Sequence, residues 1–273
     1  GGIPFVSISV KPTRNEALEY YRRATLSNHL NVHLQEEVKS INGRDGNYEV
    51  ITTKTTYHTK YIVLATGFYD RPVLMNIPGE DLPKVTHYYK EPHFYAMQKV
   101  VVVGANNSAV DAALETFRKG AEVTMVIRGG EIGKRVKYWV KPDMENRITE
   151  GSVKAFFNST LAAIYEDRVD VQTPDGIVTI PNDYVIATTG YQPQFDFLRK
   201  TGIHLSDDEK LRPDYNPETM ETNKKNIYLA GVVCGGMDTH SWFIENSRVH
   251  ATMIMKDILR KENQMKHQNL KSK

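Results

Sequence analysis

The chain has 273 residues with an apolar share of 40% and a charged share of 25%, a composition that excludes disorder on a large scale. At about 150 residues per domain, this length has room for two domains that each bury a core. The net charge of +2 gives no general attraction to nucleic acid, and no apolar run approaches the ~20 residues that cross a bilayer, so we expect a cytoplasmic protein that binds neither nucleic acid nor membrane.

The first third of the chain predicts a helix, a hairpin and a buried strand. Residues 14–27 follow Thr13 and carry apolar side chains at helical spacing, which predicts a capped helix. Turn residues separate the first two of the extended segments, which predicts a hairpin. The predicted strands are residues 35–41, 47–53 and 62–65. Several prolines between residues 69 and 83 predict an irregular segment.

The middle of the chain predicts a βαβ unit. Residues 99–103 are a continuous apolar run, as in strands that are covered on both faces. Asn107 or Ser108 caps a helix that has an alanine-rich stripe and ends near Gly120. Residues 123–127 form the next strand, so the two strands should be parallel with a right-handed crossover.

The remainder of the chain predicts short strands and a long terminal helix. The predicted strands are residues 153–157, 169–173, 177–180, 184–187 and 226–233. The helix is predicted at residues 242–260 with Ile244, Val249, Ile254 and Ile258 facing inward. Residues 261–273 are polar and basic, which predicts a solvated tail.

The turn inside the βαβ unit predicts a seat for a pyrophosphate. Its residues are Gly104, Asn106, Asn107, Ser108 and Ala109. They lie between a buried strand and a helix start, where backbone N–H groups and the helix dipole favour a phosphate. Gly104 permits the sharp turn and the small Ala109 lets helix and strand approach, whereas Asn106 departs from the second glycine of G-x-G-x-x-G/A.

Arg128 indicates which nucleotide the turn binds. It ends the second strand about 20 residues after the turn, where an NAD enzyme carries an acidic residue for the ribose. A guanidinium there pairs with a 2′-phosphate, and Lys134 and Arg135 add charge in the next loop, so NADPH is favoured over NADH. The alternative is a capped βαβ turn with a surface arginine, and the register of all these features favours nucleotide binding.

The sequence also resembles a known family. The similarity lies in residues 100–120, in Lys137, Tyr138 and Trp139 with Pro142, and in residues 227–236. These segments resemble thioredoxin reductase-like flavoproteins, most closely the bacillithiol disulfide reductases of Gram-positive bacteria. The resemblance implies an α/β fold with two Rossmann-type FAD/NAD(P)-binding domains. It implies an FAD-type domain at residues 1–90 and 193–273 and an inserted NADPH-binding domain at residues 91–192.

The same resemblance implies an activity and its cofactor contacts. The implied oxidoreductase uses NADPH and FAD to reduce a small-molecule disulfide, and a homo-oligomer is compatible with it. The implied FAD contacts are Val38, Ala65, Thr66, Gly67, Gly190, Gly231 and Thr239. Val38 stands where relatives meet the adenine, and a helix that begins near Thr239 would aim its N-terminus at the flavin. Val232 stands where relatives often place an acidic residue.

One element of that family has no counterpart before Pro4. The flavin domain of the family starts with a strand, a G-x-G-x-x-G turn and a helix, followed by the proposed active-site cysteine, so we expect a chain truncated at its N-terminus. Cys234 is the only cysteine and is predicted to be buried and inert. The catalytic residue therefore stays unknown, and no residue spacing indicates a metal site.

Two alternatives to the disulfide reductase stay open. Residues 77–79 and His87 faintly resemble the connector of flavin monooxygenases, although His87 by itself predicts a solvated or capping histidine. A chain without the first flavin element could instead be only a nucleotide-binding module. Flavin content and oxygen-dependent product formation distinguish the three functions.

Overall fold

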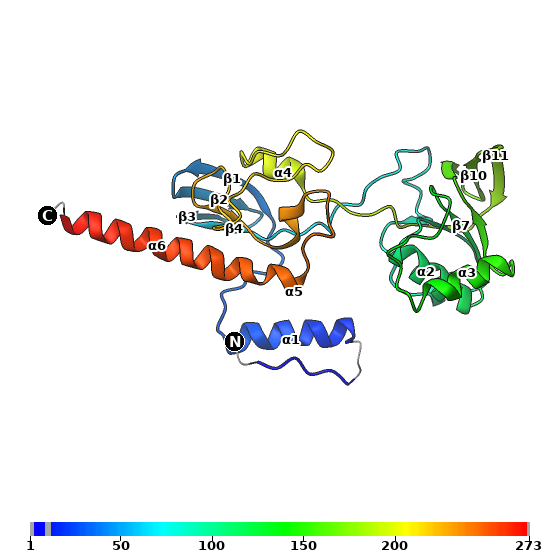
Figure 1. Cartoon of the computed structure of the whole chain (residues 1–273), viewed down its shortest axis with the longest axis horizontal. Coiled ribbons are helices and arrows are strands. Elements are labelled where there is room, and N and C mark those ends of the chain that lie inside the picture. Colours follow the sequence, from blue (N-terminus) through cyan, green and yellow to red (C-terminus); the bar gives the residue numbers. More distant parts are fainter. Residues whose placement is uncertain (1–2, 9–11, 272–273) are drawn as a thin grey trace.

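The computed structural model describes residues 3–8 and 12–271, with side chains to residue 268. Figure 1 shows two lobes that are joined by two crossings of the chain. We call residues 73–190 the inserted lobe, and residues 35–71 with residues 192–271 the outer lobe. The crossings pair with each other, because Val73 N donates to the Gly190 carbonyl at 2.9 Å and Gln192 N donates to the Arg71 carbonyl at 2.8 Å.

The inserted lobe is built on a parallel five-stranded sheet in the order β5-β12-β6-β7-β8. Its elements are β5 (Val85–Thr86), η1 (His93–Tyr95), β6 (Lys99–Val103), α2 (Asn107–Arg118), β7 (Glu122–Val126), α3 (Lys141–Thr149), β8 (Lys154–Phe156) and β12 (Tyr184–Ala187). The predicted βαβ unit is confirmed as β6, α2 and β7. Val102, Val110 and Met125 are fully buried between the sheet and its helices, as the continuous apolar runs require.

An antiparallel sheet in the order β11-β10-β9 packs on this lobe through a second apolar cluster. Its strands are β9 (Thr160–Ile164), β10 (Arg168–Thr173) and β11 (Gly176–Pro181). The cluster includes Met75, Ile77 and Leu82, which precede β5 in the chain. The sheet and the apolar clusters of this lobe include residues before residue 91, and the predicted domain boundaries stay a prediction.

The outer lobe combines two small sheets with a long helix (Figure 1). Its elements are β1 (Val38–Arg44), β2 (Asn47–Thr52), β3 (Thr56–Thr59), β4 (Ile62–Leu64), α4 (Phe195–Lys200), β13 (Ile227–Leu229), η2 (Gly231–Gly235), α5 (Ile244–Ser247) and α6 (Val249–Lys271). The predicted hairpin is confirmed as β1 and β2, which pair with β3 in one antiparallel sheet. β4 and β13 form a parallel pair.

Helix α1 (Arg14–Ser27) confirms the first predicted helix. Thr13 and Glu16 form a capping box, in which Thr13 N donates to Glu16 Oε2 at 2.6 Å and Glu16 N donates to Thr13 Oγ1 at 3.3 Å. These bonds satisfy donors at the start of the helix. No residue of α1 is buried, so local capping rather than packing defines where it begins.

The last third of the chain differs from its prediction. The strand predicted at residues 226–233 ends at Leu229, because Gly231 has a φ of +81° and turns the chain into η2. The long helix begins at Val249 rather than near residue 242, so Ile244 is 74% exposed and Val249 is 49% exposed, while Ile254 is buried. The predicted inward placement of Ile244 and of Val249 was therefore wrong.

The prediction of a solvated tail is wrong for residues 261–271, because α6 continues to Lys271. Residues 272–273 lie outside the described part of the chain. The side chains of Glu262 and Lys261 hold the extension on the outer lobe. Glu262 accepts hydrogen bonds of 2.7 Å from Lys60 and from Tyr61. Lys261 donates to Tyr228 at 2.8 Å, next to the buried carboxylate of Asp257. Within the described residues, no helix is both long and apolar enough to cross a bilayer.

Candidate functional site

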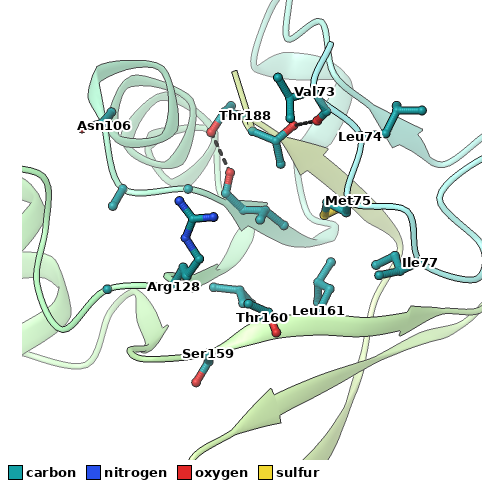
Figure 2. Close-up of a pocket in the computed structure, with 16 residues that line it drawn as sticks. Val73, Leu74, Met75, Ile77, Asn106, Arg128, Ser159, Thr160, Leu161 and Thr188 are labelled. Carbon is teal, nitrogen blue, oxygen red and sulfur yellow. Dashed lines mark hydrogen bonds between the residues drawn. The ribbon is translucent and has the colours of Figure 1, made fainter. Parts of the chain in front are cut away.

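A cavity of about 540 Å³ opens at the carboxyl ends of the parallel strands in the inserted lobe (Figure 2). Its walls come from the segment before β5, the turn after β6, the ends of β7 and β12, and the start of β9. The lining residues are Val73, Leu74, Met75, Ile77, Val103, Gly104, Ala105, Asn106, Val126, Arg128, Gly129, Ser159, Thr160, Leu161, Thr188 and Thr189. Ligands of open α/β sheets bind at this edge.

The turn after β6 has the geometry of a phosphate seat. Gly104 has a φ of +130°, and a Cβ there would lie 2.5 Å from Thr188 Oγ1 and 3.3 Å from Ala109 Cβ. Only glycine fits this position, and the small Ala109 packs directly beside it. Asn106, rather than Asn107 or Ser108, occupies the N-cap position of α2. Its side chain is exposed and makes no capping hydrogen bond. The first N–H groups of α2 therefore have no side-chain cap.

Arg128 lies across the cavity from the apolar wall (Figure 2). Among the described residues, no carboxylate lies within ion-pair distance of its guanidinium. An unpaired guanidinium next to the start of a helix favours a ligand with several negative charges. The geometry fits a dinucleotide that carries a diphosphate and a further phosphate.

The apolar wall opposite Arg128 was missed by the sequence analysis. Met75, Ile77 and Leu161 line the cavity with apolar surface. The carboxylate of Glu80 shapes this wall, because it accepts hydrogen bonds of 2.7 Å from both Met75 N and Asn76 N. An irregular, proline-rich segment has no periodic signal that could have revealed such a wall.

His87 and Thr189 contact the segment before β5. His87 Nε2 lies 3.2 Å from Glu80 Oε1, and both side chains are about nine-tenths buried. The Thr189 hydroxyl donates to the Val73 carbonyl at 2.6 Å. His87 was predicted to be solvated or to cap a helix, and it is instead enclosed by this wall.

The structure divides the predicted nucleotide contacts into two groups. Gly104, Asn106 and Arg128 line the cavity. The other predicted residues do not line it: Asn107, Ser108, Ala109, Lys134 and Arg135. Lys134 and Arg135 are exposed, and Lys134 lies 3.6 Å from Glu131. Their predicted roles at a 2′-phosphate stay predictions.

Two of the predicted FAD contacts, Gly67 and Gly231, lie in the outer lobe, at the carboxyl end of the β4–β13 pair. Because these strands are parallel, Gly67 and Gly231 follow their carboxyl ends on one edge. Both glycines have positive φ values, +68° and +81°, and no atom lies within 4 Å of a Cβ at either position. The open space fits a ligand that approaches the backbone closely.

The remaining predicted FAD contacts are more scattered. Gly190 has the same open geometry at a crossing between the lobes. Val38 begins β1 and is 40% exposed. No helix begins near Thr239, because α5 starts only at Ile244, so the predicted helix N-terminus at Thr239 is wrong.

His250 holds the backbone at Gly231. Its Nδ1 accepts a hydrogen bond of 3.1 Å from Gly231 N, so the neutral ring carries its proton on Nε2. Burial lowers the pKa of His250, which favours this neutral form. Nε2 is buried and has no hydrogen-bond partner among the described residues. The ring also packs against Trp242, with the ring centroids 4.5 Å apart, so Nδ1 is the ring nitrogen that fixes the backbone at Gly231.

Cys234 lies in η2 and is only 2% exposed. Burial raises the pKa of its thiol to about 12. Because the thiolate is the reactive form, we expect this cysteine to be inert at neutral pH. The prediction of a buried thiol is confirmed, and its lack of reactivity stays a prediction.

Comparison with known proteins places the chain in a family. Residues 1–231 match the family described as pyridine nucleotide-disulphide oxidoreductase. The chain is 42% identical over 265 residues to the bacilliredoxin reductase Bdr of Bacillus subtilis, which covers 96% of this chain and 82% of the relative.

Two solved structures are similar throughout. The bacillithiol disulfide reductase Bdr from Bacillus cereus has a TM-score of 0.92 at 40% identity, covering 96% of this chain and 82% of that one. A thioredoxin reductase from Lactococcus lactis has a TM-score of 0.73 at 19% identity, covering 95% and 88%, and shows the fold alone. The predicted resemblance and two-domain fold class are confirmed. The chain belongs to the pyridine nucleotide-disulphide oxidoreductase family, and it is an oxidoreductase of the NAD(P)H-dependent disulfide reductase type.

Proposed function

We propose that the cavity of the inserted lobe binds NADPH and that the outer lobe binds FAD. The observation that carries the proposal is the unpaired guanidinium of Arg128 beside the uncapped start of α2. A diphosphate on the turn at Gly104 and a 2′-phosphate at Arg128 would satisfy both groups. The apolar wall at Met75 and Ile77 would shield the adenosine from water.

We further propose that the reducible substrate is bacillithiol disulfide. The relatives are named bacilliredoxin reductase and bacillithiol disulfide reductase, which supports this class of substrate. In the overall reaction, NADPH, one proton and the disulfide give NADP⁺ and two thiols. A bound flavin supplies two-electron chemistry between the nicotinamide and the disulfide. Cys234 takes no part, because it is buried and protonated.

The protein's own residues then have three tasks. The turn at Gly104 orients the diphosphate, Arg128 selects the phosphorylated ribose, and His250 holds the backbone of Gly231 by accepting from its N–H at Nδ1. The single cysteine, which forms no disulfide within the chain, supports a location in the cytosol.

The monooxygenase alternative gains no support from its residues. Ile77 lines the nucleotide cavity, and a Cβ at Gly79 would lie 1.9 Å from the Ile164 carbonyl oxygen. His87 lies beside Glu80. Ile77, Gly79 and His87 therefore contribute to the packing of the inserted lobe.

A turnover experiment tests the proposed substrate. The full-length protein, purified with its flavin, is given NADPH and either bacillithiol disulfide or glutathione disulfide. We expect NADPH oxidation to accelerate with bacillithiol disulfide, and two thiols to form for each NADPH consumed. Unchanged NADPH oxidation in its presence would contradict the proposed substrate. Product hydroxylation that depends on oxygen would instead support the monooxygenase.

A further inference from the structure

The loop between β7 and α3 carries Lys134 and Arg135 and packs against the turn after β6, and a side chain of α2 helps to hold it there. We propose that Asn107 is a positioning residue that clips residues 129–137 onto the first turn of α2, and thereby sets the preference for a 2′-phosphorylated nucleotide. The inference rests on the proposed binding of NADPH and assigns Asn107 a role other than direct contact with the ligand.

The side-chain amide of Asn107 uses both of its ends on this loop. Its Nδ2 donates to the Arg135 carbonyl at 3.1 Å, and its Oδ1 accepts from Lys137 N at 3.0 Å. The two bonds span adjacent peptide groups, so they fix both the distance and the direction of the loop. Asn107 itself does not line the cavity.

Two further contacts bring the same loop against the phosphate turn. Gly133 N donates to the Ala105 carbonyl at 2.9 Å. A Cβ at Gly133 would lie 2.3 Å from Asn106 Oδ1 and 2.9 Å from the Ala105 backbone oxygen, so a larger residue would push the loop away from the turn. One helical turn after Asn107, Asp111 accepts a bond of 2.9 Å from Lys137 Nζ.

The hydrogen bonds of Asn107 matter because this loop carries Lys134 and Arg135. Ile132 and Val136 are buried, which anchors the apolar side of the loop in the core. Arg135 is exposed beside the clip, and in the described structure its side chain pairs with no carboxylate. Its long side chain can turn toward a bound phosphate only while the backbone stays close to the turn. A loop released from α2 would spread these charges over a wider volume and weaken their effect on one phosphate.

The test compares two small probes, 2′,5′-ADP and 5′-AMP, which share the adenosine and differ in the 2′-phosphate. Their dissociation constants are measured by calorimetry for the full chain and for Asn107→Ala. We expect Asn107→Ala to weaken 2′,5′-ADP about three- to tenfold, the factor for one or two exposed hydrogen bonds, and to leave 5′-AMP unchanged. Arg128→Ala serves as the reference for loss of the phosphate contact, and Asn263→Ala on the exposed face of α6 serves as the control.

A second measurement follows the loop without any ligand. Hydrogen exchange of residues 129–137 should accelerate in Asn107→Ala and stay unchanged in Asn263→Ala, with equal melting temperatures showing that the fold is retained. Unchanged loop exchange, or an equal loss for both probes, would overturn the role of Asn107. If the unmodified protein itself does not prefer 2′,5′-ADP, the proposed NADPH site fails as well, whereas a preference that Arg128→Ala removes and Asn107→Ala keeps overturns this inference alone.

Discussion

The Thr188 hydroxyl donates a hydrogen bond of 2.7 Å to the Val103 carbonyl, which joins the carboxyl ends of β12 and β6 inside the nucleotide cavity. The bond keeps Thr188 Oγ1 only 2.5 Å from the position that a Cβ at Gly104 would take. The conformation of the phosphate turn is therefore set by a residue more than eighty positions away.

Gly104→Ala tests this packing. The added methyl group would lie 2.5 Å from Thr188 Oγ1, on a backbone with a φ of +130°. We expect a stability loss of about 1–3 kcal/mol and at least about tenfold weaker nucleotide binding, because the strained turn must move. Gly176→Ala is the control, because it has a similar φ of +123° but no atom lies within 4 Å of its Cβ, and it does not line the cavity. Equal nucleotide affinity in the two variants would contradict the steric argument.

Lys84→Met tests a buried cation that holds the antiparallel sheet. Lys84 Nζ donates to the carbonyls of Tyr165 and Asn182 at 2.8 Å and of Glu166 at 3.2 Å. Methionine would leave these carbonyls without a donor, so we expect unfolding by urea to show a loss of about 2–4 kcal/mol.

The matched control for Lys84 is Lys154→Met, which removes an exposed ion pair with Glu122. We expect a change of about 0.5 kcal/mol or less for that variant. Similar losses for both lysines would show that the buried contacts of Lys84 contribute nothing special.

His250 predicts acid sensitivity of the outer lobe. Burial lowers its pKa from the usual 6.5, and its ring packs 4.5 Å from Trp242. A lowered pKa means that the folded state disfavours the charged ring, so this contribution to stability is present above pH 6.5 and is lost as the pH falls below it. We expect the urea midpoint to fall between pH 7.5 and pH 5.5 by less in His250→Asn than in the unmodified protein. An identical fall in both proteins would argue against a role for His250.

Cys234 should resist thiol reagents while the protein is folded. Its side chain is buried and its pKa is raised to about 12. We expect no labelling by a maleimide at pH 7.5 in buffer and one label per chain in denaturing urea. Stoichiometric labelling of the folded chain would show that the thiol is accessible, and would reopen a role for it in disulfide exchange.

The βαβ unit could be predicted because its signals are local. The apolar run at Lys99–Val103, the glycine after it and the cationic residue at the end of the next strand lie close together in the sequence. Their order alone places the turn at a helix start and Arg128 across from it. The helix at Arg14–Ser27 was found for the same reason, because Thr13 and Glu16 cap it locally.

The missed features depend on partners that are remote in sequence. The tail became part of α6 because Glu262 bonds to Lys60 and Tyr61, about two hundred residues earlier. The apolar wall is the exception, because Glu80 holds its irregular segment from only four and five residues away, and such a segment has no periodic signal. The role of Asn107 was likewise hidden, because its amide meets a loop that lies about thirty residues further along the chain.

The affinities for NADPH and for NADH, determined by calorimetry on the protein and on Arg128→Ala, test the assignment of the cavity directly. We expect the unmodified protein to bind NADPH at least about tenfold more tightly than NADH, and Arg128→Ala to lose most of that difference through weaker NADPH binding alone. Unchanged affinities for both nucleotides in Arg128→Ala would contradict the assignment of this cavity to NADPH.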